Sequence, residues 1–270
     1  MNCKTSHKLR KVGTMSEILA RIDMQIEIKE KADYNISSVL QGVMMEKIEA
    51  EYAGKLHDTA VNPYSMIFFK EGDKYIWRIN TFNNEAKEKI IDVFMNPELK
   101  DFTIKHRNNE TVKILEKTLK MITYDDLVEK YYLTDSKRYI NINFRTPASF
   151  KSNGKYMIYP TTRTIFQSLI NRFSAYSDKI SLDVNDLLEN FENYSEITDY
   201  RMRSTRFHLE GITIPSFIGE VTIKITGPQM MVNLANMLAA FGEYAGIGIK
   251  TSIGMGAVEI NKERRGVKNA

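Results

Sequence analysis

The sequence predicts an α+β fold, in which two consecutive units of similar element order are followed by a glycine-rich loop. Three observations lead to this prediction. Several short segments alternate apolar and polar residues with a period of two, which is typical of half-buried strands in an antiparallel sheet. Between these segments apolar residues recur every three or four positions, as they do on amphipathic helices. The order of the two patterns in the first half of the chain returns loosely in the second half.

The first unit starts with a strand at residues 20–29, ARIDMQIEIK, where every second residue is apolar. Residues 35–48 change to helical spacing, which predicts an amphipathic helix. Residues 65–79 form two strands around an EGDK turn, 84–96 a short helix, and 102–116 further strands around an Asn-Asn turn. This order predicts a ferredoxin-like (RRM-like) unit, with helices on one face of an antiparallel sheet.

The second unit repeats this order without visible sequence identity. Its predicted elements are strand 138–144, helices 161–173 and 183–191, strands 205–214 and 216–226, helix 227–245 and a closing strand 257–260. The architecture is therefore two tandem ferredoxin-like units joined around residues 124–138. We expect a disordered basic arm or extension at 1–17, the first unit at 18–130, the second at 131–261 and a tail at 262–270.

Composition narrows the class of protein. The 270 residues are 43% hydrophobic and 27% charged, and no apolar run approaches the roughly 20 residues that span a bilayer. The single cysteine, Cys3, has no internal partner, and no secretory signal is visible, so a cytoplasmic location is expected. The net charge of +4 allows an anionic partner without requiring one. Residues 1–14 read as an extension before a natural start at Met15.

A glycine-rich loop precedes the closing strand. Gly246, Gly248, Gly254 and Gly256 fall within eleven residues that also contain Lys250. Because the loop connects a helix to a strand, it differs from phosphate-binding fingerprints, which connect a strand to a helix. Glycine permits positive φ and the close approach of a backbone or a phosphate. On its own the loop fits a tight connection with a solvated lysine better than it fits a binding site.

Three stretches together resemble one family. Residues 215–225 and 242–260, PSFIGEVTIKI and GEYAGIGIKTSIGMGAVEI, resemble the C-terminal signature of the CRISPR-associated RNA endonucleases, RAMP superfamily members that cut the repeat transcript into guide RNAs. Residues 144–173 resemble the segment that opens the family's second domain, and 40–66 its first helix and the loop after it. The resemblance extends from about residue 20 to residue 260. It implies ferredoxin-like domains and CRISPR repeat RNA as the partner.

The resemblance implies a catalytic histidine just beyond the first helix, which matches His57 in KLHDTAVNPYS. An imidazole can give or take a proton near neutral pH. The implied reaction needs no metal: the ribose 2′-hydroxyl attacks the adjacent phosphate, expels the 5′-oxygen and leaves a 2′,3′-cyclic phosphate. Whether His57 acts as acid or base stays open. Lys55 or Lys250 could stabilise the charge that develops on the phosphorane.

The family commonly adds a tyrosine and a lysine to this histidine, and here the sequence departs from the pattern. The two positions match Met45 and Asn62. Tyr52 and Lys55 are near His57 in sequence and could substitute, although a packed tyrosine and a solvated lysine fit equally well. Ser65 is a weaker candidate.

RNA binding requires cations that reach phosphates. Arg201, Arg203 and Arg206 are close in sequence, and strand alternation would put the first two on one face. Lys151 and Lys155 flank the first turn of the second unit. We expect these residues to bind RNA together with Lys250 and the four glycines, which would pass beside the groove between the units.

Other candidate residues have weaker support. Tyr156 and Tyr159 could stack on bases, but aromatic residues near a strand end are more often in a core, so we expect them there. His106 is expected at the surface, His208 in packing, and His7 in the arm. Neither a metal-ligand spacing nor a cofactor fingerprint is visible, so no metal and no cofactor are expected.

Three alternatives to the nuclease were weighed. A RAMP protein that binds guide RNA without cutting, as a subunit of a CRISPR interference complex, is the main one, because the tyrosine and the lysine are missing. A small-molecule enzyme explains none of the three stretches. An RRM-type messenger-RNA binder would carry an aromatic sheet signature that is absent. We expect a monomer or a homodimer, without membrane attachment.

Overall fold

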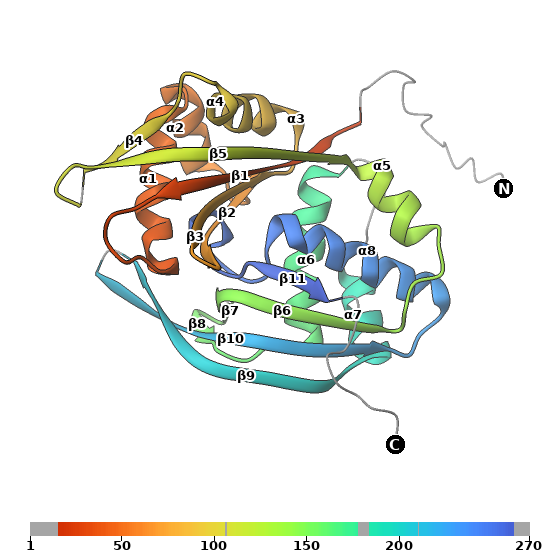
Figure 1. Ribbon diagram of the computed structural model, residues 1–270. Helices are drawn as coiled ribbons and strands as arrows, with labels where there is room; N and C mark the ends of the chain where they lie inside the picture. Colours follow the sequence, from red (N-terminus) through yellow and green to blue (C-terminus); the bar gives the residue numbers. More distant parts are fainter. Residues whose placement is uncertain (1–15, 106, 178–183, 210, 262–270) are drawn as a thin grey trace.

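The computed structural model describes residues 16–105, 107–177, 184–209 and 211–261. The expected arm and tail, His7 and His106 lie wholly or mostly outside these residues. Figure 1 shows one antiparallel sheet above another, each with helices packed against it. The predicted α+β fold of two tandem ferredoxin-like units is confirmed. Within the described part of the chain, no helix is both long and apolar enough to cross a membrane.

The first sheet is built from five strands in the order β2-β3-β1-β5-β4. They are β1 (Ile18–Glu27), β2 (Tyr64–Glu71), β3 (Lys74–Thr81), β4 (Asp101–Ile104) and β5 (Glu110–Thr123). Central β1 pairs with β3 on one side and β5 on the other, both antiparallel. Without the short edge strand β4, this is the ferredoxin-like order.

Helices cover the face of this sheet that carries Ile22 and Met24. They are η1 (Tyr34–Ile36), α1 (Ser37–Lys47), α2 (Ala50–Asp58) and a continuous helix of α3 (Asn84–Ala86), η2 (Lys87–Ile91) and α4 (Asp92–Met95). The loop expected after the first helix is therefore wrong, because that segment forms α2. The segment is helical because it buries a stripe of residues four positions apart, Ile48, Tyr52 and Leu56.

The second sheet has the order β11-β6-β10-β9, and a two-stranded hairpin, β7-β8, projects beside it. Its strands are β6 (Tyr139–Ala148), β7 (Phe150–Ser152), β8 (Lys155–Met157), β9 (Ser195–Leu209), β10 (Ile212–Ile225) and β11 (Val258–Asn261). The expected strand at 205–214 is wrong, since these residues cross the turn of the long β9-β10 hairpin. The first ten residues of β9 are mostly exposed on both faces, so they lack the alternation of a half-buried strand.

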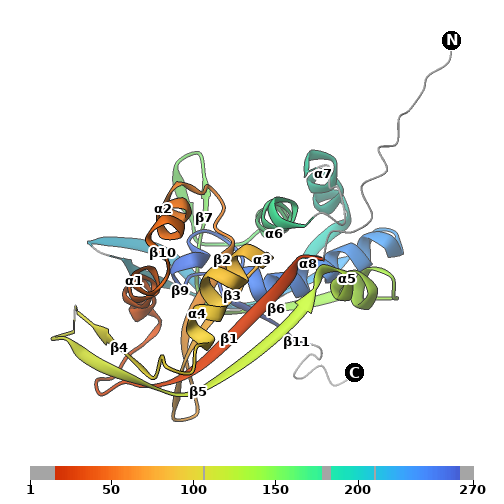
Figure 2. The same ribbon diagram turned by 90° about the horizontal axis from the view of Figure 1, so that it is seen from above.

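The helices of the second unit pack on one face of its sheet (Figures 1 and 2). They are α5 (Tyr124–Leu127), η3 (Val128–Tyr132), α6 (Thr162–Tyr176), α7 (Val184–Tyr194) and α8 (Gln229–Ala245). The short η4 (Thr251–Ile253) instead contacts β2 and α1 of the first unit. The connection expected at 124–138 thus starts with a helix, which a capping box between Thr123 and Asp126 begins. Tyr124 and Leu127 are buried in the core of the second unit, so this segment packs with the second unit. The expected boundary at residue 130 would have placed it in the first.

The two units are packed against each other through their cores. Phe82 of the first unit contacts Phe241 of α8, with ring centroids 5.8 Å apart, and its carbonyl accepts a hydrogen bond of 2.9 Å from the Tyr124 hydroxyl. The Tyr176 hydroxyl at the end of α6 donates to the Val61 carbonyl. These contacts fix the end of α6 against the loop that follows α2.

Candidate functional site

The glycine-rich loop, residues 246–256, connects α8 to β11. All four of its glycines have positive φ: Gly246 70°, Gly248 101°, Gly254 102° and Gly256 65°. A Cβ at Gly254 would lie 2.2 Å from Cβ of Ser37, the first residue of α1, and one at Gly256 would lie 2.1 Å from the Ile247 carbonyl oxygen. Any side chain at these two positions is therefore both strained and obstructed. The bare backbone lets the loop press on the start of α1 in the first unit.

Lys250, in the middle of this loop, is exposed and also has a left-handed backbone, with φ 56° and ψ 34°. This conformation costs an ordinary residue about 1–2 kcal/mol, and glycine is its usual occupant. A lysine at such a position is retained at a cost to stability. This is a pattern typical of functional sites.

Lys250 lines a cavity of about 550 Å³ between the two units. We call it the basic cavity. It is enclosed by the loop after α2, by β7, by α6 and by the glycine-rich loop; its residues are Ala60, Val61, Asn62, Phe150, Lys151, Thr164, Gln167, Ser168, Asn171, Arg172, Gly248, Ile249, Lys250, Thr251 and Ser252. Three of these carry a positive charge, and none of the described lining residues is acidic. A cavity of this kind attracts anions.

Arg172 is the innermost of the three cations. Its Nη1 donates to the Ser168 hydroxyl and carbonyl oxygens, at 2.5 and 3.2 Å, and its Nη2 donates to the Gly248 carbonyl at 2.6 Å. Burial lowers the pKa of the Arg172 guanidinium to about 10, so the group is still charged at neutral pH. No signal in the sequence singled out this residue, because one arginine within a helical pattern is usually solvated.

His57 lies in the last turn of α2, three residues before the first residue that lines the basic cavity. Its side chain is exposed and makes no hydrogen bond or ion pair with the residues that the structure describes. Such an imidazole is accessible to a substrate that enters the cavity from this side.

The structure does not bring Tyr52 and Lys55 to His57. Tyr52 is buried, its hydroxyl has no hydrogen-bond partner among the described residues, and burial raises its pKa well above the usual range. Lys55 forms an ion pair of 2.5 Å with Glu85 of α3. Residues two positions apart on a helix do not face each other, so Lys55 and His57 point to different sides of α2.

The remaining predicted cations divide between two places. Lys151 lines the basic cavity, whereas Arg201 and Arg203 line a shallow groove of about 630 Å³ across β6, β10 and β9. Strand alternation puts Arg206 on the opposite face of β9. Lys155 is exposed on β8, next to the tip of the hairpin.

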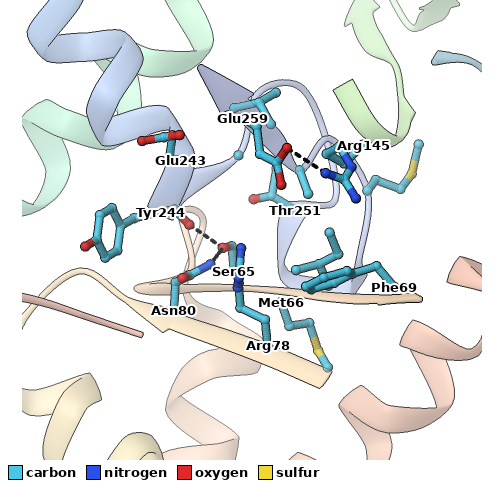
Figure 3. A pocket seen from close by; sticks show the side chains of 15 residues that line it. Ser65, Met66, Phe69, Arg78, Asn80, Arg145, Glu243, Tyr244, Thr251 and Glu259 are labelled. Atoms are coloured by element: carbon cyan, nitrogen blue, oxygen red, sulfur yellow. Dashed lines mark hydrogen bonds and ion pairs between the residues drawn. The ribbon is translucent and has the colours of Figure 1, made fainter. Parts of the chain in front are cut away.

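A narrow slot between the two sheets contains more charges, but they neutralise one another (Figure 3). Arg78 is bonded to Asp23 at 2.6 Å, and Arg145 to Glu259 at 2.6 Å. Ser65 is here as well, donating to the Tyr244 carbonyl, and so lies outside the basic cavity. The slot offers about 20 Å³, which is room for a water molecule or so, and we assign it to the interface between the units.

The other sequence candidates lie elsewhere. His208 is exposed, which corrects the expected packing role, and its Nδ1 is 3.3 Å from the Thr213 hydroxyl. Tyr156 and Tyr159 are exposed as well, not in the core. Among the described residues, no group of three or more His, Cys, Asp or Glu side chains could hold a metal ion.

The chain is similar to known proteins in both sequence and structure. The family model described as CRISPR-associated endoribonuclease Cas6 matches residues 142–258. Curated proteins of that name from Streptococcus thermophilus and Mycobacterium tuberculosis are each 29% identical to this chain; the first match covers 83% of this chain and 90% of that protein, the second 91% and 79%. A solved Cas6 product complex has a TM-score of 0.74 at 18% identity and covers 92% of this chain and 100% of its own. The family resemblance predicted from the sequence is confirmed.

Proposed function

We propose that this chain, which resembles the Cas6 endoribonucleases along nearly all of its described length, cuts CRISPR repeat RNA in a precursor transcript to give mature guide RNAs. The basic cavity is the observation that carries the proposal. It joins the loop that follows His57 to the glycine-rich loop, and its charges suit the phosphates of an RNA backbone. Such a reaction would take place in the cytoplasm, where the transcript is made, and would require no cofactor.

In the proposed reaction the nucleophile belongs to the substrate. The ribose 2′-oxygen attacks the adjacent phosphorus as its proton leaves to a base, and the bond to the 5′-oxygen breaks as that oxygen gains a proton. The products carry a 2′,3′-cyclic phosphate and a 5′-hydroxyl. His57 transfers one of these two protons, and no metal ion takes part. Lys250 stabilises the charge on the phosphorane from the glycine-rich loop.

The proposed RNA path has two parts. Near the scissile phosphate, Lys151 and Lys250 bind the backbone within the basic cavity, and the glycines let the loop approach it. Farther away, Arg201 and Arg203 contact phosphates along the shallow groove, which is open enough to follow a strand. Lys155, on β8 beside the hairpin tip, extends the first part at its edge. Arg206 lies on the opposite face of β9, so it takes no part in this path.

Supporting catalytic residues for His57 are a separate question. Tyr52 and Lys55 were candidates on sequence, but the burial of Tyr52 and the pairing of Lys55 with Glu85 give them no support. We therefore assign one of the two proton transfers to His57 and neither of them to Tyr52 or Lys55.

The second candidate function is a guide-RNA-binding subunit of an interference complex that does not cut. It is favoured by Met45 and Asn62, which stand where the family commonly has a tyrosine and a lysine. Met45 is half-buried and Asn62 lines the cavity. Both side chains are uncharged, so neither supplies a charge near His57.

Cleavage of the host organism's own repeat RNA in EDTA decides between the two. We expect the parent protein to cut it and leave a cyclic phosphate, while His57→Ala binds with unchanged affinity and cuts about 100- to 10,000-fold more slowly. An RNA with a 2′-deoxyribose at the scissile position should bind and stay intact. If the parent binds the repeat without cutting it, the binding-subunit function replaces the nuclease.

A further inference from the structure

Arg172 is a half-buried cation of the basic cavity that has no acidic partner among the described residues. The described residues offer no carboxylate to its guanidinium, and its hydrogen bonds go to Ser168 and Gly248 only. By contrast, Arg78 and Arg145 in the interface each bind a carboxylate. A half-buried cation without a counter-charge can accept an anion that is supplied from outside.

The donors of Arg172 are only partly used. A guanidinium has five N–H groups in a planar fork. Both N–H groups of Nη1 serve Ser168 and one of Nη2 serves Gly248. The Nε–H and the second Nη2–H have no acceptor among the described residues. Nε and Nη2 border one edge of the guanidinium, and such an edge can bind two oxygens of a phosphate.

The used donors hold the glycine-rich loop. The Gly248 carbonyl accepts from Arg172, the Gly248 N–H donates to the Ser168 hydroxyl at 2.8 Å, and the Ile249 N–H donates to the Ser149 carbonyl at 2.9 Å. Lys250 is the next residue. These three hydrogen bonds therefore fix the backbone immediately before the lysine.

We propose that Arg172 binds a backbone phosphate of the RNA in the basic cavity through its free edge, while its other donors hold the loop so that Lys250 reaches the same phosphate. This inference rests on the proposed function for the identity of the ligand. A phosphate diester of an RNA backbone suits the cavity because the lining offers three cations to successive anionic groups.

The test compares Arg172→Gln with Arg138→Gln. Glutamine keeps a polar amide donor but is shorter and carries no charge. Arg138 is a matched control, since it also donates to two backbone carbonyls, those of Ile225 and Gly227, and lies outside both the basic cavity and the groove. The RNA probe is the repeat with a 2′-deoxyribose at the scissile position, and its affinity is measured over a range of salt concentrations.

We expect Arg172→Gln to lose about 10- to 100-fold in affinity and to lower the slope of log affinity against log salt by about 0.7. Arg138→Gln should change neither. Arg172→Lys, which keeps the charge, should retain the slope even if the loop loosens. If the folded Arg172→Gln protein keeps the parent's slope of log affinity against log salt, Arg172 does not bind a phosphate and only stabilises the loop.

A second arm uses inorganic phosphate, so that the test does not depend on the RNA. We expect phosphate to raise the melting temperature of the parent above that in potassium chloride of equal ionic strength, and to have no such effect on Arg172→Gln. An equal rise in both proteins contradicts the proposal. If the parent responds to phosphate but does not bind the repeat, the proposed function fails while the anion site stands.

Discussion

The contact between the glycine-rich loop and the first unit can be tested with a single methyl group. Gly254 has φ 102°, and a Cβ there would lie 2.2 Å from the Cβ and 2.4 Å from the Oγ of Ser37. Ser37 is fully buried at the start of α1, so it cannot swing into solvent. Gly254→Ala therefore forces either the loop or the helix to move.

Two costs add up in this variant. Holding alanine in an unfavourable backbone region costs about 1–3 kcal/mol. Overpacking a tight contact costs about 1–3 kcal/mol more, because the neighbours must shift. The unfolding free energy should then fall by about 2–6 kcal/mol, out of the roughly 5–15 kcal/mol that is usual for a protein domain.

Urea unfolding measures this loss, and Gly72→Ala separates its two parts. Gly72, in the β2-β3 turn, also has positive φ, 57°, but nothing lies within 4 Å of its would-be Cβ. Its replacement should cost only the backbone share of about 1–2 kcal/mol. In Gly254→Ala, a second change, Ser37→Gly, should recover much of the overpacking share. If Gly254→Ala costs no more than Gly72→Ala, the loop does not press on α1 as the geometry indicates.

Three further predictions concern the site. Lys250→Gly should leave the unfolding free energy unchanged or raise it by up to about 1 kcal/mol, because the left-handed backbone suits glycine, yet weaken binding to the uncleavable repeat; a stability loss beyond 1 kcal/mol would contradict this. Tyr52→Phe should not destabilise the protein in urea, since its buried hydroxyl has no partner among the described residues; a loss above about 1 kcal/mol would reveal a bond that the hydroxyl makes. Lys55→Met should break only the exposed pair with Glu85, worth about 0–1 kcal/mol; cleavage assays that show a loss of about 100-fold or more would instead give Lys55 a catalytic role.

Periodicity predicted the fold well where one face of an element is buried. Strand β1 and helix α6 each bury one regular stripe of apolar residues, so their spacing was readable. It failed for the first half of β9, where Asp199, Tyr200 and Arg201 are all exposed. This edge strand is stabilised by backbone hydrogen bonds to β10, which do not require an alternating pattern of apolar side chains.

The site was predicted only in part, for a related reason. The glycines and Lys250 are adjacent in sequence, so the loop was visible as a motif. Arg172 comes from a different element, and its importance follows from what lies around it: Gly248 from 76 residues away and no acidic partner among the described residues. A burial state and a missing counter-charge are properties of the fold, so they could not be read from the residues of α6.

The proposed site is shared between the two units, so its two sets of residues can lose their relative position. His57 comes from the first unit, while Arg172 and Lys250 come from the second. The relative position of the two sets depends on a few contacts, in particular the Tyr176 hydroxyl on the Val61 carbonyl and Gly254 against Ser37. A variant such as Tyr176→Phe touches neither set, yet it loosens the loop that joins His57 to the cavity. We expect it to reduce the rate of cleavage more than the affinity for the uncleavable repeat, because binding to phosphates tolerates a displacement that proton transfer does not. Equal losses in rate and affinity would mean that the two units bind the RNA as one surface, with no separate demand on the position of His57.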